Sequence, residues 1–173
     1  MFFDPAMIDA WPLTGTLTSR GLKLLRDAPT PDTHEAVVRD HLRLFGGAGK
    51  SLACPYESPW VDRDGLVFDI STFDVRDAYA EYGLRVTAYN REPDDHVGYE
   101  LAFVAHLARM IAENPRADTV ELTKVITRFT SHHLAAFTPQ LREAMTAHAD
   151  TVFYRAMAEL LGGFVATART FTA

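Results

Sequence analysis

The sequence predicts an all-helical protein that forms a single compact domain of several helices. Apolar residues recur at three- and four-residue steps along most of the chain, which is the spacing of one helix face. Residues that start or stop helices separate these stretches at intervals of little more than ten residues. The 173 residues are enough to bury a core, so we expect one domain over residues 1–173.

The first predicted helices are short. Residues 1–30 indicate one or two helices, interrupted by Pro12 and Gly15. Asp32 or Thr33 is suited to cap the next helix, which we expect to run to about Phe45. The residues of this helix expected to face inward are Val37, Val38, His41, Leu42 and Phe45.

A further helix is predicted after an irregular segment, residues 54–60. Ser71 or Thr72 would cap it and Gly83 would end it. Its expected inward residues are Phe73, Val75, Ala78, Tyr79 and Tyr82. Residues 84–89 alternate apolar and polar side chains, but a single strand has no partner here, so we expect an extended linker.

The central helix is predicted at about residues 93–113. Pro93 suits the first helical position, and Asp94 and Asp95 would then lie in the first turn, near the positive end of the helix dipole. Apolar residues follow on two faces, which indicates a buried helix. The two faces are Val97, Leu101, Val104, Ala108 and Ile111, and Phe103, Leu107 and Met110.

Three helices are predicted to complete the chain. One starts at Asp118 or Thr119 and runs to Leu134, and the next begins with Thr138 as cap and Pro139 in the first position. The third covers residues 152–165. Expected inward residues of the first two are Val120, Val125, Ile126, Phe129, Leu141 and Met145.

Composition restricts the classes of partner. A net charge of −6 argues against nucleic acid or an anionic membrane surface as partner. The only cysteine, Cys54, cannot form an internal disulfide, which fits a reducing compartment. There is no apolar run long enough to cross a bilayer, and the N-terminus lacks the basic start of a secretion signal. We therefore expect a cytoplasmic protein.

The glycine-rich stretch of residues 46–51 has the Gly-Lys-Ser ending of a phosphate-binding loop. Leu44 stands where that motif needs its first glycine, and a helix rather than a strand is predicted before it. A helix C-cap followed by a loop is the interpretation that we favour.

A metal or acid–base site is a second chemical possibility. His96 and Glu100 lie four residues apart, so they would share a helix face. A small helical metalloenzyme is the alternative that this pair suggests, although two ligands do not complete a coordination shell. We expect no enzyme activity, no bound metal and no cofactor.

The middle of the chain favours peptide binding. Acidic residues are frequent between residues 57 and 95, and Tyr56, Trp60, Phe68 and Tyr99 lie in or near the same stretch. The acidic residues are Glu57, Asp62, Asp64, Asp69, Asp74, Asp77, Glu81, Glu92, Asp94 and Asp95. Such a surface suits a peptide with a basic end and an apolar body, while a merely solvated acidic face remains the alternative.

Three segments, in order along the chain, resemble the TorD/DmsD family. They are Arg43-Leu44-Phe45 with residues 55–60, residues 92–103, and His133-Leu134 with residues 153–160. The match departs from the family at Gly46-Gly47 and at Ala135-Ala136-Phe137, and residues 1–30 match poorly.

The resemblance implies an all-helical cytoplasmic chaperone that is not an enzyme. Members bind the twin-arginine signal peptide, the body of a molybdenum-cofactor oxidoreductase, or both, and hold the precursor for cofactor insertion before export. Their clients are of the dimethyl sulfoxide or trimethylamine N-oxide reductase type. The alternative within the family is a chaperone of a non-exported subunit of the nitrate reductase type. A monomer and a domain-swapped dimer are both compatible with it.

The resemblance also implies site residues. Asp95 and His96 match the motif pair of the family's peptide-binding site, and Glu100 is a further candidate. Leu44, Phe45, Tyr56 and Trp60 match apolar and aromatic positions of that site. Glu92, Pro93 and Asp94 would complete the signature as structural residues.

Overall fold

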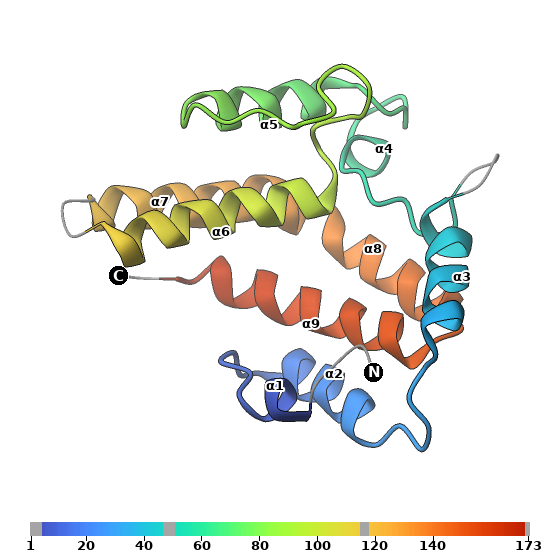
Figure 1. Cartoon of the computed structure of the whole chain (residues 1–173). Coiled ribbons are helices and arrows are strands. Elements are labelled where there is room, and N and C mark those ends of the chain that lie inside the picture. The colour runs from blue at the N-terminus through green and yellow to red at the C-terminus, as the bar shows by residue number, and fades with distance from the viewer. Residues whose placement is uncertain (1–4, 47–50, 115–117, 172–173) are drawn as a thin grey trace. The chain divides into compact units, whose positions relative to one another are not determined.

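A computed structural model describes residues 5–46, 51–114 and 118–171 (Figure 1). These residues are mainly helical and contain no strand, only an isolated β-bridge between Tyr56 and His96. The helices are α1 (Pro5–Asp9), α2 (Thr16–Arg26), α3 (His34–Phe45), α4 (Ser58–Val61), α5 (Ile70–Ala80), α6 (Val97–Glu113), α7 (Thr119–Phe129), the π-helical turn η1 (Thr130–Leu134), α8 (Ala135–His148) and α9 (Val152–Ala168). The all-α prediction is confirmed.

The chain divides into two units of dense internal packing. The first unit contains Met1–Cys54 and Thr138–Thr167, and the second contains Pro55–Phe137 and Ala168–Ala173. The positions of the parts relative to one another are not determined (Figure 1). The expectation of a single domain stays a prediction.

The first unit packs α2 against α9. Ile8, Leu22 and Leu160 form a buried cluster, flanked by Trp11, Leu25 and Met157. Gly21 lets the two helices approach, because a Cβ there would lie 2.9 Å from Cγ of Leu160.

Asp40 fixes the start of α9 within the same unit. Its buried carboxylate accepts hydrogen bonds from the backbone N–H of Thr151 at 2.8 Å and from that residue's hydroxyl at 2.6 Å. The N–H of Asp150 and the guanidinium of Arg43 also donate to it, each at 3.2 Å. Burial by itself raises the pKa of Asp40, but these hydrogen bonds outweigh it and hold the pKa below its ordinary value.

An aromatic core holds the second unit. The rings of Tyr79 on α5, Phe103 on α6 and Phe129 on α7 lie with centroids 4.8–6.2 Å apart. Edge and tilted contacts of this kind add to the stabilisation from apolar burial. α6 and α7 lie side by side along this core (Figure 1).

The predicted start of the central helix is wrong. α6 begins at Val97, and Pro93, Asp94 and Asp95 precede it instead of forming its first turn. The reason is that His96 keeps an extended backbone and pairs with Tyr56, while its ring nitrogen Nδ1 accepts the N–H of Gly98 at 2.9 Å. A histidine thus serves as the N-cap.

The predicted helix break at Thr138 and Pro139 is also wrong. Helical structure continues from Thr119 to His148, and Pro139 lies inside α8. A π-turn precedes the proline, in which the N–H of Ala135 reaches the carbonyl of Thr130. Helices accommodate proline where neighbouring turns depart from α geometry, and here buried side chains on both sides of it support the helix. They are Leu134, Phe137, Leu141 and Met145.

Several expected helix faces differ from the structure. The side chains expected inside but exposed are Val38, His41, Leu42, Phe73 and Val120. On α3, Asp40 and Leu44 are buried instead, because the hydrogen bonds of Asp40 turn that face inward. The cap of α5 is Asp69, because the hydroxyl groups of Ser71 and Thr72 bond to Asp62 and Asp95.

Other predicted boundaries hold. Thr33 caps α3 by accepting the N–H of Ala36, and Asp118 caps α7 by accepting that of Glu121. A helix precedes the glycine-rich loop as expected, whereas residues 47–50 of that loop lie outside the described residues. Across the described ranges, no helix combines the length and the apolar character needed to cross a membrane.

Candidate functional site

Asp95 is buried in the second unit, where it joins three segments. One carboxylate oxygen accepts the N–H of Ser58 at 2.7 Å, at the start of α4, and the other accepts the hydroxyl of Thr72 on α5 at 2.8 Å. Its backbone carbonyl accepts the N–H of Glu57. With an exposed fraction of 0%, Asp95 holds α4 and α5 in place and does not reach the surface.

Asp94, also fully buried, forms an ion pair with Arg76 on α5. The guanidinium donates to one oxygen through Nε at 3.0 Å and Nη2 at 2.6 Å. The same guanidinium lies over the rings of Tyr89 and Phe73, at 4.5 and 5.4 Å from their centroids. This pair orients the chain that leads into α6, since charge-assisted bonds of this geometry are strong.

His96 and its neighbours form a partly exposed aromatic group. The ring of His96 meets Tyr56 edge-on at 5.1 Å and Tyr99 at 5.7 Å. Because Nδ1 accepts the N–H of Gly98, the proton of the neutral ring lies on Nε2. Tyr99 donates from its hydroxyl to exposed Glu92 at 3.0 Å. The structure therefore brings Tyr56, His96 and Glu92 together at the start of α6.

Trp60 lies half-buried on α4, the short helix that Asp95 holds in place. Its backbone N–H bonds to the carbonyl of Glu57, and Val97 bonds to the carbonyl of Pro55. These bonds fix the residues on either side of Tyr56 against the start of α6. The predicted motif residues of the second unit are thus linked through the backbone.

Two buried glutamates lie in the same unit. Glu57 accepts from, or pairs with, Nδ1 of His133 at 3.0 Å; burial raises its pKa and His133 partly offsets this. Glu100 is fully buried, and neither of its carboxylate oxygens has a hydrogen-bond partner. Burial, with Glu57 and Asp95 nearby, raises the pKa of Glu100 well above its ordinary value. Folding therefore shifts the ionisation of Glu100 toward higher pH.

The structure does not support the alternative of a metal site on His96 and Glu100. Nδ1 of His96 accepts the backbone N–H of Gly98, and the side chain of Glu100 is fully buried. Within residues 5–46, 51–114 and 118–171, no three His, Cys, Asp or Glu side chains gather in a group able to hold a metal ion.

A surface of mixed character follows α4, and we call residues 61–77 the acidic segment. Six of its large apolar side chains are exposed, with Leu66 at 62%, Ile70 at 66% and Phe73 at 50%. The six are Val61, Leu66, Val67, Phe68, Ile70 and Phe73. Asp64, Asp74 and Asp77 are exposed among them. Contiguous apolar patches are typical of interaction sites, so we treat this segment as a candidate interaction surface.

The turn within the acidic segment displays these side chains. Gly65 and Phe68 both have positive φ, at 62° and 63°. The left-handed conformation is unfavourable for a residue with a Cβ, so the surroundings must hold Phe68 in it. Asp62 contributes to this by accepting the N–H and the hydroxyl of Ser71.

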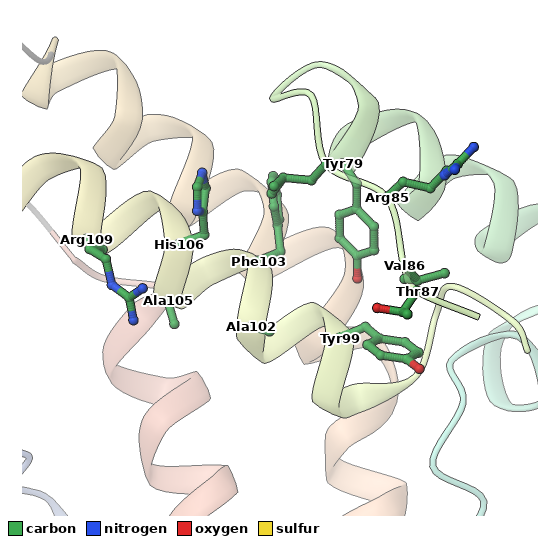
Figure 2. Close-up of a pocket in the computed structure, with 11 residues that line it drawn as sticks. Tyr79, Arg85, Val86, Thr87, Tyr99, Ala102, Phe103, Ala105, His106 and Arg109 are labelled. Carbon is green, nitrogen blue, oxygen red and sulfur yellow. The ribbon is translucent and has the colours of Figure 1, made fainter. Parts of the chain in front are cut away.

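A groove of about 440 Å³ runs along α6 in the second unit, and we call it the α6 groove (Figure 2). One wall is the α6 face with Tyr99, Phe103 and His106, and the segment after α5 forms the other. The remaining lining residues are Tyr79, Leu84, Arg85, Val86, Thr87, Ala102, Ala105 and Arg109.

Leu44 and Phe45, the two remaining predicted site residues, belong to the first unit. Leu44 is fully buried, and its carbonyl accepts the N–H of Ala53 across the glycine-rich loop. Phe45 is half-buried and packs against His41 and Tyr154 at 5.2 and 5.4 Å. Their place relative to the acidic segment stays a prediction.

Comparison with known proteins identifies the family. A family model described as nitrate reductase delta subunit matches residues 16–143. The chain belongs to this family. It includes chaperones of the TorD and DmsD type, as the resemblance implied.

Named relatives agree with this membership. The chain is 28% identical over 152 residues to the Tat proofreading chaperone DmsD of Salmonella typhi, covering 88% of this chain and 70% of that protein. It is 30% identical over 136 residues to the chaperone protein TorD of Aliivibrio fischeri, covering 78% and 63%. The chain thus spans less than two thirds of the length of that TorD. Both relatives are named as chaperones, and membership of this family supports the expectation that the chain is not an enzyme.

Sequence reasoning missed part of the arrangement. Tyr79 was expected to face inward, and Arg76 only falls within the same predicted helix; yet Arg76 pairs with Asp94, and the hydroxyl of Tyr79 donates to the carbonyl of Asp94. His133 was noted only as part of the third segment, although it pairs with Glu57. No local signal could reveal these pairs, because their partners lie 15–76 residues apart.

Proposed function

We propose that this chain is a cytoplasmic chaperone that binds the twin-arginine signal peptide of a molybdenum-cofactor oxidoreductase. It would hold the precursor until the cofactor is inserted and export can follow. Membership of the family and the names of the relatives support the chaperone part. The single cysteine supports a reducing location.

The acidic segment is the observation that carries the proposal. A twin-arginine signal has a basic end and an apolar stretch. Exposed apolar side chains such as Ile70 and Phe73 offer area for the apolar stretch, and the carboxylates of Asp64 and Asp74 suit arginine guanidinium groups. Burial of apolar area would supply the affinity, and the paired charges would orient the peptide.

The motif residues take different roles in this proposal. Tyr56, Trp60 and His96 are partly exposed, and we assign them to the surface that meets the peptide. Asp95, Asp94 and Glu100 are enclosed, so they act by positioning those residues and the acidic segment. Leu44 is as enclosed as Asp95, so it too acts through packing, whereas half-buried Phe45 stays a candidate contact on the first unit.

Titration calorimetry with signal peptides from the molybdoenzymes of the same genome tests the proposal. We expect saturable binding to one peptide, and a loss of affinity of about tenfold or more when both arginines of that peptide become glutamine. Equal affinity for the glutamine peptide would rule out recognition of the arginine pair.

A surface variant tests the acidic segment. Ile70→Ser with Phe73→Ser removes exposed apolar area without opening the core, so the fold should persist while peptide affinity falls about tenfold. Val38→Ser with Val120→Ser is the matched control, because these side chains are also exposed but lie on α3 and α7. An equal loss in both variants would show that the effect is not local.

A non-exported client is the second candidate, and the family description, nitrate reductase delta subunit, favours it. Its test is affinity purification of the tagged chain from its own host, followed by titration against the purified client subunit. Binding of that subunit, with no binding to any signal peptide, would replace the first candidate by the second.

A further inference from the structure

The α6 groove has the size and lining of a binding site. Its volume of about 440 Å³ falls within the range of ligand-holding clefts, roughly 300–1,000 Å³. Tyr79 and Phe103 are buried and close its floor, while half-buried Leu84 and Tyr99 present apolar surface to it. The side chains of Ala102 and Ala105 are too small to fill the groove on the α6 side. Residues 84–87, which are not helical, form the opposite wall.

The charge of the groove is opposite to that of the chain. Among the described residues that line it, Arg85, His106 and Arg109 are basic and none is acidic, whereas the whole sequence carries −6. Figure 2 shows Arg109 and His106 toward one end of the groove and Arg85 toward the other. A local positive site on an acidic protein attracts a negative partner.

The described carboxylates beside the groove leave the charges of Arg85 and Arg109 largely uncompensated. Glu113 approaches Arg109 only to 4.0 Å, and both side chains are more than two-thirds exposed, so this pair is weak. Glu92 is engaged by the hydroxyl of Tyr99. The guanidinium of Arg85 lies 4.8 Å above the ring of Tyr89, a contact that orients it and leaves its N–H groups able to donate.

We propose that the α6 groove binds an acidic peptide segment, with apolar side chains against Leu84 and Tyr99 and carboxylates on Arg85 and Arg109. The acidic segment of residues 61–77 attracts basic peptides, so the second unit would carry two surfaces for two ligands of opposite charge. In the function proposed above, the acidic ligand is part of the body of the client enzyme. That last assignment rests on the proposed function, while the chemistry of the groove does not.

A synthetic probe tests the groove directly. The probe is a ten-residue peptide in which glutamate alternates with leucine and phenylalanine, and its counterpart carries lysine in place of every glutamate. We expect the chain of residues 1–173 to bind the acidic probe, with an affinity that falls as salt rises. In the presence of saturating twin-arginine signal peptide, it should bind the lysine peptide at least tenfold more weakly. No saturable binding of the acidic probe would overturn the proposal.

Charge and shape variants locate the binding. R85E with R109E should lower affinity for the acidic probe at least tenfold, whereas R39E with R169E, which changes the net charge equally at exposed sites elsewhere, should lower it less than threefold. Ala102→Phe should lower affinity about tenfold by filling the groove, and Ala112→Phe, an exposed position of α6 that does not line the groove, is its control.

The outcomes separate this inference from the proposed function. R85E with R109E should leave the affinity for a twin-arginine signal peptide within twofold of the unmodified chain. Suppose that no signal peptide binds, but that the acidic probe binds the unmodified chain and not R85E with R109E. This result would refute the proposed function and support the α6 groove as a peptide site. Equal affinity of the probe for the groove variants and their controls would refute the groove.

Discussion

Asp40 in the first unit and the carboxyl groups around Asp95 in the second are buried in different ways. Burial and hydrogen bonds set the pKa of Asp40, whose oxygens accept bonds from Thr151, Asp150 and Arg43. Asp95 is equally well bonded, but Glu57 and Glu100 lie near enough to interact with it.

The difference separates two effects of buried charge. A carboxylate with a full set of donors stabilises the helix start that it holds. A further carboxyl group without donors, as in Glu100, costs stability when ionised and makes that cost depend on pH. The first unit should therefore be insensitive to mild changes of pH, and the second should not.

Truncation of the capping aspartates should have the largest effect. Asp95→Ala leaves the buried N–H of Ser58 and the hydroxyl of Thr72 unpaired, and Asp40→Ala does the same at Thr151. Each should lower the free energy of unfolding by about 3–4 kcal/mol, measured by urea denaturation. A loss below about 1 kcal/mol for Asp95→Ala would show that Asp95 is not structural.

Glu100→Gln should stabilise the protein at neutral pH. Folding raises the pKa of Glu100, so above the ordinary value of 4.5 the unfolded chain ionises first. The free energy of unfolding of the wild type should fall as pH rises until the folded group also loses its proton.

Glutamine removes this ionisation. Urea denaturation between pH 5 and 8 should show a gain on the order of 1–3 kcal/mol at the upper end and a shallower slope. Some slope should remain, because the pKa of Glu57 is also raised. A slope unchanged by the substitution would place the titrating group elsewhere.

Removal of one hydroxyl from each site sharpens the comparison. Thr72→Val loses a single hydrogen bond to Asp95 and should cost about 1 kcal/mol. Thr151→Val loses the bond to Asp40 and the acceptor for the N–H of Tyr154, so it should cost about 2 kcal/mol. Thermal or urea unfolding of the two variants gives the difference, and a larger loss for Thr72→Val would reverse the ranking.

Tyr99→Phe should have the smallest effect. It removes a hydrogen bond to exposed Glu92, and such exposed bonds contribute less than about 0.5 kcal/mol. Urea denaturation should therefore barely distinguish it from the wild type. A loss above about 1 kcal/mol would mean that this bond fixes the start of α6 as firmly as Asp95 does.

Much of the helix pattern was predictable because its signals are local. Thr33 and Asp118 cap their helices as their positions in the sequence indicate, and Val75, Phe103, Val125 and Leu141 are buried as their spacing indicates. Capping uses a side chain and an N–H a few residues apart, so the signal survives in one segment of sequence.

The candidate site was predicted only in outline. The motif of residues 92–103 and the acidic middle of the chain both fall in the second unit, and their part in peptide binding stays a prediction. The roles of Asp94 and Asp95 were misplaced, because a first-turn carboxylate and a buried cross-link look alike in sequence. Only the contacts of Asp95 with Ser58 and Thr72, 37 and 23 residues away, distinguish them.

The sequence by itself determined the helical class, several helix ends and the family, since each rests on neighbouring residues or on ordered motifs. Tertiary structure decided which face of α3 is buried, that helix continues through Pro139, and that Glu100 is enclosed without a donor. The physical reason is that burial and the pairing of charges depend on segments far apart in the chain, and these meet only when the chain has folded.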